Sequence, residues 1–242
     1  MEAMYGRLAG WWPALSPVEA YEREAAFVAA CLAGRRTVLE LGSGGGHLST
    51  WLARRFAMTL SDLSDAMLDV SRALNPHCRH VRGDMRSLRL GERFDAVLVH
   101  DAIGYMTSEA DLAATFTTAA AHLRVGGALL VVPDHTRETW APWTARGGGD
   151  GAGGIGAWFR GECWDPDPTD TRVSTRYELE VRRADGAVEA QDEVHELGLF
   201  AVDVWVRLLG EAGFDVDVRW TDARAGAPAR VAFLAILREE AG

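Results

Sequence analysis

Short apolar runs alternate with amphipathic stretches along the first half of the chain. The run at 38–41 is bounded by polar residues and has the length and composition of a buried parallel strand. Comparable runs occupy 57–60, 78–81, 94–100 and 128–132, with helical periodicity between several of them. Strands that alternate with helices in this way predict an α/β fold built on a parallel sheet.

Capping residues mark the helices. Ser16 has the side chain of a helix N-cap, Glu19 follows three residues later as in a capping box, and Gly34 provides a stop. Ser108 is the expected cap of a later helix, with acidic residues in its first turn. We therefore expect helices over 17–31, 47–55, 108–122 and 202–212.

The chain after the fifth strand has a different pattern. Residues 133–170 lack a clear period, and they contain a glycine-rich tract at 147–154 that is expected to be a mobile or tight loop. Residues 171–181 then alternate between apolar and polar, a turn follows at 184–186, and 188–199 returns as a partner strand. This part predicts an antiparallel hairpin.

Composition and charge narrow the classes of function. The 242 residues carry a formal net charge of −10, which argues against a nucleic-acid substrate because phosphate binding needs a basic surface. The scattered Cys31, Cys78 and Cys163 fit a reducing compartment and give no zinc-ligand spacing. No apolar run reaches the ~20 residues that span a bilayer, and the first residues lack a secretory pattern. We expect a cytoplasmic protein without nucleic acid, membrane or metal as partner.

Glycines occupy alternate positions directly after the first strand. The segment is Glu40-Leu41-Gly42-Ser43-Gly44-Gly45-Gly46-His47, which has the pattern E-x-G-x-G-x-G. Glycines permit a tight turn and a close approach of the backbone to a ligand. The amides at the start of the next helix point toward such a ligand. Position 47 is His where the dinucleotide pattern has Gly, which argues against a nucleotide-binding oxidoreductase.

Two acidic residues follow at the ends of the next strands. Asp62 lies twenty residues after Gly42, where a carboxylate can accept both hydroxyls of a ribose, although alone it is equally consistent with a helix cap. Asp84 stands in Gly83-Asp84-Met85 after the third strand. A carboxylate there can accept from an adenine amino group while the next backbone amide donates to the ring. Taken alone, Gly83-Asp84-Met85 is a weak signal.

These motifs, in this order and spacing, resemble those of class I S-adenosylmethionine-dependent methyltransferases over most of the chain. The resemblance implies S-adenosylmethionine as cofactor, with Asp62 at the ribose, Asp84 and Met85 at the adenine, and the glycine loop at the methionine part. The cofactor-binding residues that it implies are Tyr5, Tyr21, Glu40, Gly42, Ser43, Gly44, Gly46, Asp62, Leu63, Met67, Asp84, Met85 and His100.

The resemblance also implies the fold. It is α/β, a three-layer Rossmann-like sheet of seven mostly parallel strands with a final antiparallel strand, plus an inserted antiparallel β-hairpin or lid. Strands expected at 214–220 and 231–237 complete that sheet. We expect a single methyltransferase domain over 1–242. Its parts are an aromatic N-terminal cap and helix (1–33), a cofactor-binding core (34–134), the inserted lid and hairpin (135–200) and the completion of the sheet (201–242).

The finer resemblance is to small-molecule methyltransferases of natural-product pathways. Ile103-Gly104-Tyr105 and the inserted hairpin are similar to enzymes that methylate the amino group of deoxysugars. Those enzymes often carry Ser-Ser where this chain has Asp101-Ala102, so the acceptor stays open. An amine, amino-sugar-like acceptor is the first expectation. The alternatives are methylation at oxygen or carbon of an aromatic or hydroxylated small molecule, and a catalytically silent cofactor-binding protein.

Methyl transfer from a sulfonium depends mainly on positioning, and a base helps when the acceptor must lose a proton. His100, at the end of the fourth strand beside Asp101, is the best-placed base, and His135 follows the fifth strand. These three are the expected catalytic residues, and each is also consistent with a structural role. The expected acceptor-binding residues are Trp11, Tyr105, Asp134, Trp140, Trp143, Trp158 and His195.

Tryptophans surround the glycine-rich tract, although exposed aromatic surface is costly unless it meets a partner. This favours a lid, or a homodimer contact through the inserted hairpin, that lines the acceptor pocket. A small satellite core is the other interpretation.

Overall fold

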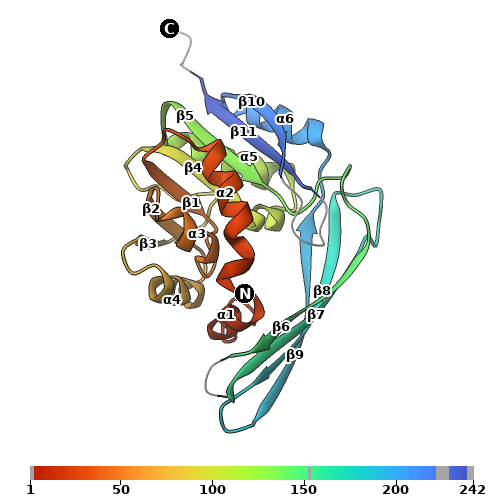
Figure 1. Cartoon of the computed structure of the whole chain (residues 1–242). Coiled ribbons are helices and arrows are strands. Elements are labelled where there is room, and N and C mark those ends of the chain that lie inside the picture. The colour runs from red at the N-terminus through yellow and green to blue at the C-terminus, as the bar shows by residue number, and fades with distance from the viewer. Residues whose placement is uncertain (1–2, 152–153, 222–228, 239–242) are drawn as a thin grey trace.

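The computed structural model describes residues 3–151, 154–221 and 229–238. Its larger sheet has seven strands in the order β10-β11-β5-β4-β1-β2-β3 (Figure 1). Neighbouring strands are parallel from β5 to β3, whereas β11 runs antiparallel to both β5 and β10. The strands are β1 (Thr37–Leu41), β2 (Ala57–Asp62), β3 (Arg79–Arg82), β4 (Phe94–His100), β5 (Leu123–Val132), β10 (Phe214–Trp220) and β11 (Val231–Leu237). The predicted sheet, including its antiparallel strand, is confirmed.

Helices cover both faces of this sheet, because the side chains of each buried strand alternate between two cores. Val38 and Leu98 face one core together with Val28 of α2, and Leu39 and Val97 face the other. The helices are α2 (Glu22–Cys31) and α3 (His47–Leu52) on the first face, α5 (Glu109–Ala121) and α6 (Val202–Glu211) on the second, and α4 (Asp65–Leu74) beside β2 and β3. The sheet and the layer of helices on each of its faces form the predicted three-layer arrangement.

Two helix predictions need correction. The first helix begins as the 3-10 turn η2 (Val18–Tyr21) and becomes α-helical only in α2. Ser16 does not cap it, because its hydroxyl lies 2.9 Å from the Tyr21 hydroxyl, so the capping box was wrong. The helix after the glycine loop ends at Leu52 instead of Arg55. Ser108 caps α5 as expected, accepting from the amide of Asp111.

A second, four-stranded antiparallel sheet is inserted between β5 and α6 and extends away from the first (Figure 1). Its strands, in order, are β6 (Trp143–Asp150), β7 (Gly156–Trp164), β8 (Arg172–Arg182) and β9 (Val188–Gly198). β8 and β9 form the predicted hairpin. The glycine-rich tract was predicted wrongly as a loop, since Gly147–Gly149 belong to β6; residues 152 and 153 of that tract lie outside the described residues.

The N-terminal segment packs against the inserted sheet. η1 (Ala9–Trp11) and α1 (Trp12–Leu15) contain the buried Ala9 and Leu15. Met4, Leu8 and Leu15 share a core with Ala157, Leu179 and Val181 of β7 and β8. The start of the chain therefore bridges the two sheets. Among the described residues, none of the helices has the length and apolar character to cross a membrane.

Candidate functional site

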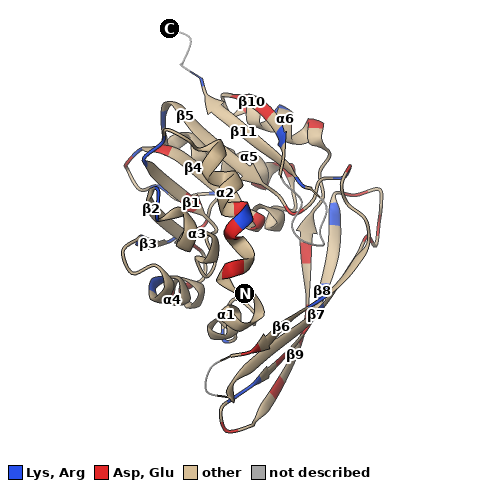
Figure 2. Ribbon diagram, viewed as in Figure 1, with Lys and Arg blue, Asp and Glu red and all other residues tan. Residues whose placement is uncertain are grey.

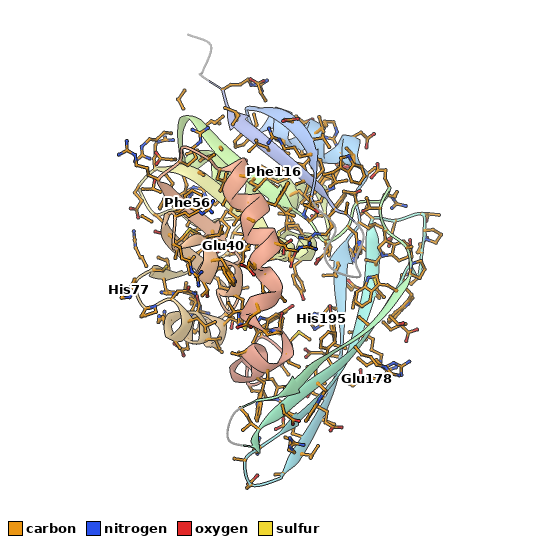
Figure 3. The ribbon with its side chains drawn as sticks, viewed as in Figure 1. Glu40, Phe56, His77, Phe116, Glu178 and His195 are labelled. Carbon is orange, nitrogen blue, oxygen red and sulfur yellow. The ribbon has the colours of Figure 1, made fainter. Side chains whose placement is uncertain are left out.

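A cavity of about 940 Å³ lies between the two sheets and the N-terminal segment. This is near the upper end of the ~300–1,000 Å³ typical of small-molecule sites. One half is lined by the carboxyl ends of β1, β2 and β4 and the loops that follow them; the other half is lined by β6 to β9. Figure 3 labels Glu40 in the first half and His195 on the inserted sheet. The volume is sufficient for two ligands side by side.

The glycine loop turns sharply between β1 and α3. Gly42 has a φ of +74°, and a Cβ there would lie 2.5 Å from the Cβ of Ala102, so a side chain is excluded. Gly46 has a φ of +73° and would place a Cβ 2.3 Å from Ser71 Oγ. Gly42, Ser43 and Gly44 line the cavity, but Gly46 does not. Gly46 thus shapes the turn, while the preceding residues face the ligand space.

Asp62 ties this loop to the end of β2. Its Oδ2 accepts from the amide of Gly44 at 2.8 Å and its Oδ1 from the amide of Ser64 at 2.8 Å. Burial raises the pKa of Asp62 from its ordinary value, although those two amides oppose the shift. The carboxylate lines the cavity with Leu63 and Met67. It is therefore placed to meet a hydroxylated ligand while holding the loop.

Glu40 is buried beneath the loop and still lines the cavity. Burial raises its pKa to about 7, although the hydroxyl of Ser49, which donates to it, lowers the value. The nearby Ser43 hydroxyl is buried and has no hydrogen-bond partner among the described residues. The Ser43 hydroxyl needs a hydrogen-bond partner, and the Glu40 carboxyl, with its pKa of about 7, can become negatively charged. Together they suit a polar, cationic ligand group.

Asp84 and Met85 line the cavity after β3. Arg86 fixes Asp84, with Nη2 donating to Oδ2 at 2.7 Å and the Arg86 amide donating to Oδ1 at 2.9 Å. The Arg86 side chain lowers the pKa of Asp84 below its usual value. Asp111 also holds Arg86, at 2.8 Å. A carboxylate held ionised in this way can accept from a ligand's amino group.

His100 is the centre of a buried ionic cluster. Its Nε2 lies 2.8 Å from Oε1 of Glu24, and its Nδ1 lies 3.3 Å from Oδ2 of Asp101. Burial alone lowers the pKa of His100, but Asp101 and Glu24 outweigh it, and the pKa stands above its usual value. Arg230 Nη2 also lies 3.0 Å from His100 Nε2, so the ring is held from several sides and is suited to positioning.

Arg230 joins this cluster from just before β11. Its guanidinium donates to Asp101 at 2.6 Å, to Asp134 at 2.8 Å and to Glu24. Glu24, His100 and Asp101 have ligand atoms within 4.8 Å of one another, as a metal site would, but here the chain supplies its own cation. Glu24 and Arg230 were not predicted, because they are separated by 206 positions and belong to no local motif.

His135 lines the cavity beside Asp134. Burial, assisted by the charge of Arg230, lowers its pKa below the usual histidine value. His135 is therefore neutral at neutral pH, whereas the pKa of His100 is shifted in the opposite direction. Of the two predicted histidine bases, His135 is the one that burial keeps in the neutral form.

A hydrogen-bonded chain connects the cavity with the inserted sheet. The hydroxyls of Tyr5 and Tyr105, which both line the cavity, lie 2.7 Å apart. The Tyr105 hydroxyl lies 2.7 Å from Nδ1 of His195, a buried residue of β9 that does not line the cavity. His195 Nε2 lies 3.2 Å from Oε1 of Glu193, without aligned hydrogen-bond geometry. Glu193 also accepts from the amides of Ala3 and Met4.

The predicted tryptophans occupy different environments. Trp143 lines the cavity, whereas Trp140 packs beside Cys163 behind it. Trp158 lies on the opposite face, with its ring 5.1 Å from the Arg182 guanidinium, and Trp11 belongs to the N-terminal core. The aromatic residues that line the cavity and were not predicted are Trp12, Phe159 and Tyr177. The alternation along β8 was the available signal for Tyr177.

The inserted sheet contributes apolar, aromatic and neutral polar side chains to the cavity, and none of its described lining residues is charged. Trp143 Nε1 and Thr175 Oγ1 are buried there without a hydrogen-bond partner among the described residues. Buried donors without partners favour a ligand that supplies acceptors. This half therefore fits a hydroxylated, largely uncharged molecule.

A comparison with protein families matches the part of the chain that forms the first half of the cavity. A family model described as a methyltransferase domain matches residues 38–127. These residues include the glycine loop, Asp62, Asp84 and the Ile103-Gly104-Tyr105 segment. The match thus spans the elements that line this half.

Named relatives extend the likeness beyond the residues that the family model matches. A dTDP-3-amino-3,6-dideoxy-alpha-D-glucopyranose N,N-dimethyltransferase from Streptomyces fradiae is 30% identical over 203 residues, which cover 81% of this chain and 78% of the relative. A dTDP-3-amino-3,4,6-trideoxy-alpha-D-glucopyranose N,N-dimethyltransferase from Streptomyces venezuelae is 33% identical over 107 residues, or 43% of this chain and 45% of the relative.

Solved structures share the whole architecture. DesVI from Streptomyces venezuelae superposes with a TM-score of 0.78 at 22% identity, covering 95% of this chain and 96% of that one. The sugar N-methyltransferase KedS8 from Streptoalloteichus sp ATCC 53650 gives a TM-score of 0.76 at 25% identity, covering 91% and 88%. The fold, including the inserted sheet, is therefore shared with these structures.

Proposed function

Because the chain belongs to the class I S-adenosylmethionine-dependent methyltransferases, we propose that it methylates the amino group of a small, amino-sugar-like molecule. The proposal rests mainly on how much of this chain is similar to proteins named for methylating sugars. A relative named for an amino-sugar substrate aligns with 81% of this chain, and a solved sugar N-methyltransferase superposes on 91% of it. Natural-product biosynthesis is the expected setting.

The residues present fit the cofactor. Asp62 would hold the ribose, Asp84 and the Met85 amide the adenine, and Glu40 with the unpaired Ser43 hydroxyl the amino-acid part. The cofactor, once bound, supplies an electrophilic methyl group. The chain's own contribution is to orient the acceptor, exclude water and take up a proton.

The acceptor would bind between the carboxyl ends of β4 and β5 and the inserted sheet. Tyr105 and Asp134 reach this space from those two strand ends, and Trp143 reaches it from β6. Asp101 and Asp134 provide negative charge for an ammonium, while Arg230 fixes their positions. We therefore assign Asp101 to the binding of a cationic acceptor, and not to the orientation of His100 as a base.

A second candidate is methyl transfer to a hydroxyl. The observation that favours it is the neutral His135 on the cavity wall, because a hydroxyl must lose its proton to a base during attack. In that case His135 is the catalytic base, and His100 retains its positioning role.

The two candidates are separated by a matched pair of acceptors. We expect S-adenosylhomocysteine to form with dTDP-3-amino-3,6-dideoxyglucose, and at least about tenfold more slowly with the analogue that carries a hydroxyl in place of the amine. Faster turnover of the hydroxyl analogue, with loss of that turnover in His135→Ala, would establish the second candidate instead.

We propose further that residues 1–242 work as one domain in the cytoplasm and that β9 mediates a homodimer. Val188 and Val194 are exposed on this edge strand. Figure 2 shows charged residues on the inserted sheet, and ion pairs such as that of Arg176 on β8 with Asp192 on β9 join neighbouring strands. Sedimentation equilibrium of the wild type and of Val194→Lys tests the dimer; a monomeric wild type contradicts it.

A further inference from the structure

The chain Tyr5, Tyr105, His195 and Glu193 has a defined direction. Glu193 is an acceptor at the far end, already bound by the amides of Ala3 at 2.8 Å and Met4 at 3.0 Å. The Glu193 carboxylate lies 3.2 Å from His195 Nε2 without hydrogen-bond alignment, and its negative charge still favours a hydrogen on that nitrogen over Nδ1. Nδ1 of the neutral ring is then an acceptor, so Tyr105 donates to it and Tyr5 donates to Tyr105.

A proton that moves along the chain in this direction leaves the cavity and approaches the surface of the protein. Tyr5 and Tyr105 line the cavity, His195 is buried behind them, and Glu193 is partly exposed. Tyr105 follows the carboxyl end of β4, the edge at which ligands of such sheets bind. The four residues come from three segments: the N-terminal segment, η3 (Asp101–Tyr105) and β9. Their convergence on one chain of contacts is therefore a product of the fold.

Methylation of an amine creates a proton-transfer problem. An alkylamine has a pKa of ~10, so at neutral pH it arrives largely as an ammonium without an electron pair. Each methyl transfer also converts a neutral amine into an ammonium again. A second methylation of the same nitrogen then requires the loss of another proton inside a cavity that excludes water.

We propose that Tyr5, Tyr105, His195 and Glu193 form the path by which the acceptor's ammonium loses its proton before attack. The proposal rests on the proposed function, since it needs an amine acceptor. The ammonium N–H bond breaks as its proton moves to the Tyr5 oxygen, and the Tyr5 proton moves to the Tyr105 oxygen. The Tyr105 proton moves to His195 Nδ1. The nitrogen keeps the electron pair, and the imidazolium formed lies against the Glu193 carboxylate.

Tyr5 touches the substrate in this scheme, and the other three are positioning residues that act through it. The titratable groups that face His195 are Tyr5, Tyr105, Tyr177 and Glu193; the Tyr177 ring centroid lies 5.1 Å away. Among the described residues that face His195, Glu193 is the only acidic one. It therefore stabilises the imidazolium, and the three phenols keep the site free of competing charge.

The test compares pH profiles of kcat for methylation of dTDP-3-amino-3,6-dideoxyglucose. His195→Asn keeps an oxygen near the Nδ1 position but cannot be protonated. We expect kcat to fall at least about tenfold at pH 7 and the gap to close to about threefold or less at pH 9.5, where solvent deprotonates the amine. Glu193→Gln should shift the profile in the same direction by a smaller factor.

Glu196→Gln is the matched control, because Glu196 is the neighbour of His195 on β9 and its exposed carboxylate faces Arg172 at 3.5 Å. It should leave the whole profile unchanged. Affinity for S-adenosylhomocysteine, measured by calorimetry, should be equal in all variants. A His195→Asn enzyme with wild-type kcat at pH 7, or with a deficit that does not change with pH, overturns the proposal.

An NMR measurement keeps this result separate from failure of the proposed function. Long-range ¹H–¹⁵N spectra of the full chain at pH 7 should show His195 neutral with its hydrogen on Nε2. A hydrogen on Nδ1, or a doubly protonated ring, overturns the proposal whatever the acceptor is. If the wild type fails to methylate the amine although the tautomer is as expected, the proposed function and the proton path both fall, and the NMR result stands as a structural finding.

Discussion

At the scale of single residues, the most informative group is the Glu40 carboxyl. Burial raises its pKa to about 7, above the unfolded value of 4.5, so the folded protein without ligand binds a proton there up to near neutrality. A cationic ligand beside Glu40 favours the carboxylate. Binding of such a ligand therefore releases a proton and strengthens as the pH rises through 7.

We accordingly predict that the affinity for S-adenosylmethionine rises about tenfold between pH 6 and pH 8. Calorimetric titrations in two buffers with different ionisation enthalpies measure both the affinity and the proton released. Glu40→Gln should show a flat profile. An affinity that falls over this interval, or proton uptake on binding, would contradict the assignment of Glu40 to a cationic part of the cofactor.

Asp62 supports a second prediction at this scale. Asp62→Ala removes the acceptor predicted for the ribose hydroxyls and frees the Gly44 amide, so affinity for S-adenosylhomocysteine should fall at least about tenfold, or ~1.4 kcal/mol. Asp69→Ala is the control, because Asp69 is an exposed aspartate on α4 whose ion pair is with Arg72. Equal affinities of the two variants would remove Asp62 from the ribose role.

At the scale of elements, the sequence predicted strands where side chains alternate, and it missed two strands, β6 and β7, in the segment around the glycine-rich tract. β8 alternates from Val173 to Val181 and was predicted together with its partner, while three of the last four residues of β6 are glycine, so that β6 resembled a loop. The pairing of β6 with β7 is set by close backbone approach. Gly148 has a φ of +100°, and a Cβ there would lie 2.0 Å from the carbonyl oxygen of Ala157.

Gly148→Ala should therefore destabilise the protein by about 2 kcal/mol or more, since both the backbone conformation and the contact exclude a methyl group. Gly149→Ala is the matched control, because a Cβ at Gly149 meets no atom within 4 Å and its φ is not positive. Urea unfolding followed by tryptophan fluorescence measures both. Similar midpoints for the two variants would show that β6 is not held by this contact.

At the scale of the whole molecule, the buried ionic cluster connects parts that are distant in sequence. Arg230, near the carboxyl end, binds Glu24 of α2, Asp101 of η3 and Asp134 after β5. The local motifs predicted the cofactor half of the cavity, because glycine loops and strand-end acids have local signatures. They could not predict Glu24 and Arg230, since a long-range ion pair has none.

Replacing Arg230 by Met should leave the buried Glu24 carboxylate without its guanidinium partner and cost about 3–5 kcal/mol at pH 7. The loss should shrink toward pH 5, because Glu24, freed from Arg230, can take up a proton. Arg219→Ala removes an exposed arginine bound to Asp217 and should change the free energy of unfolding by less than about 0.5 kcal/mol. A deficit in Arg230→Met that grows as the pH falls would contradict this account.

The central claim is that the chain transfers a methyl group from S-adenosylmethionine to nitrogen. The most direct test supplies the cofactor with a ¹³C-labelled methyl group and an amino deoxysugar, and follows the label by NMR. We predict a labelled methyl carbon coupled to the sugar proton on the amine-bearing carbon. Label on a hydroxyl oxygen or a ring carbon, or no transfer by a protein that binds the cofactor, would contradict the claim.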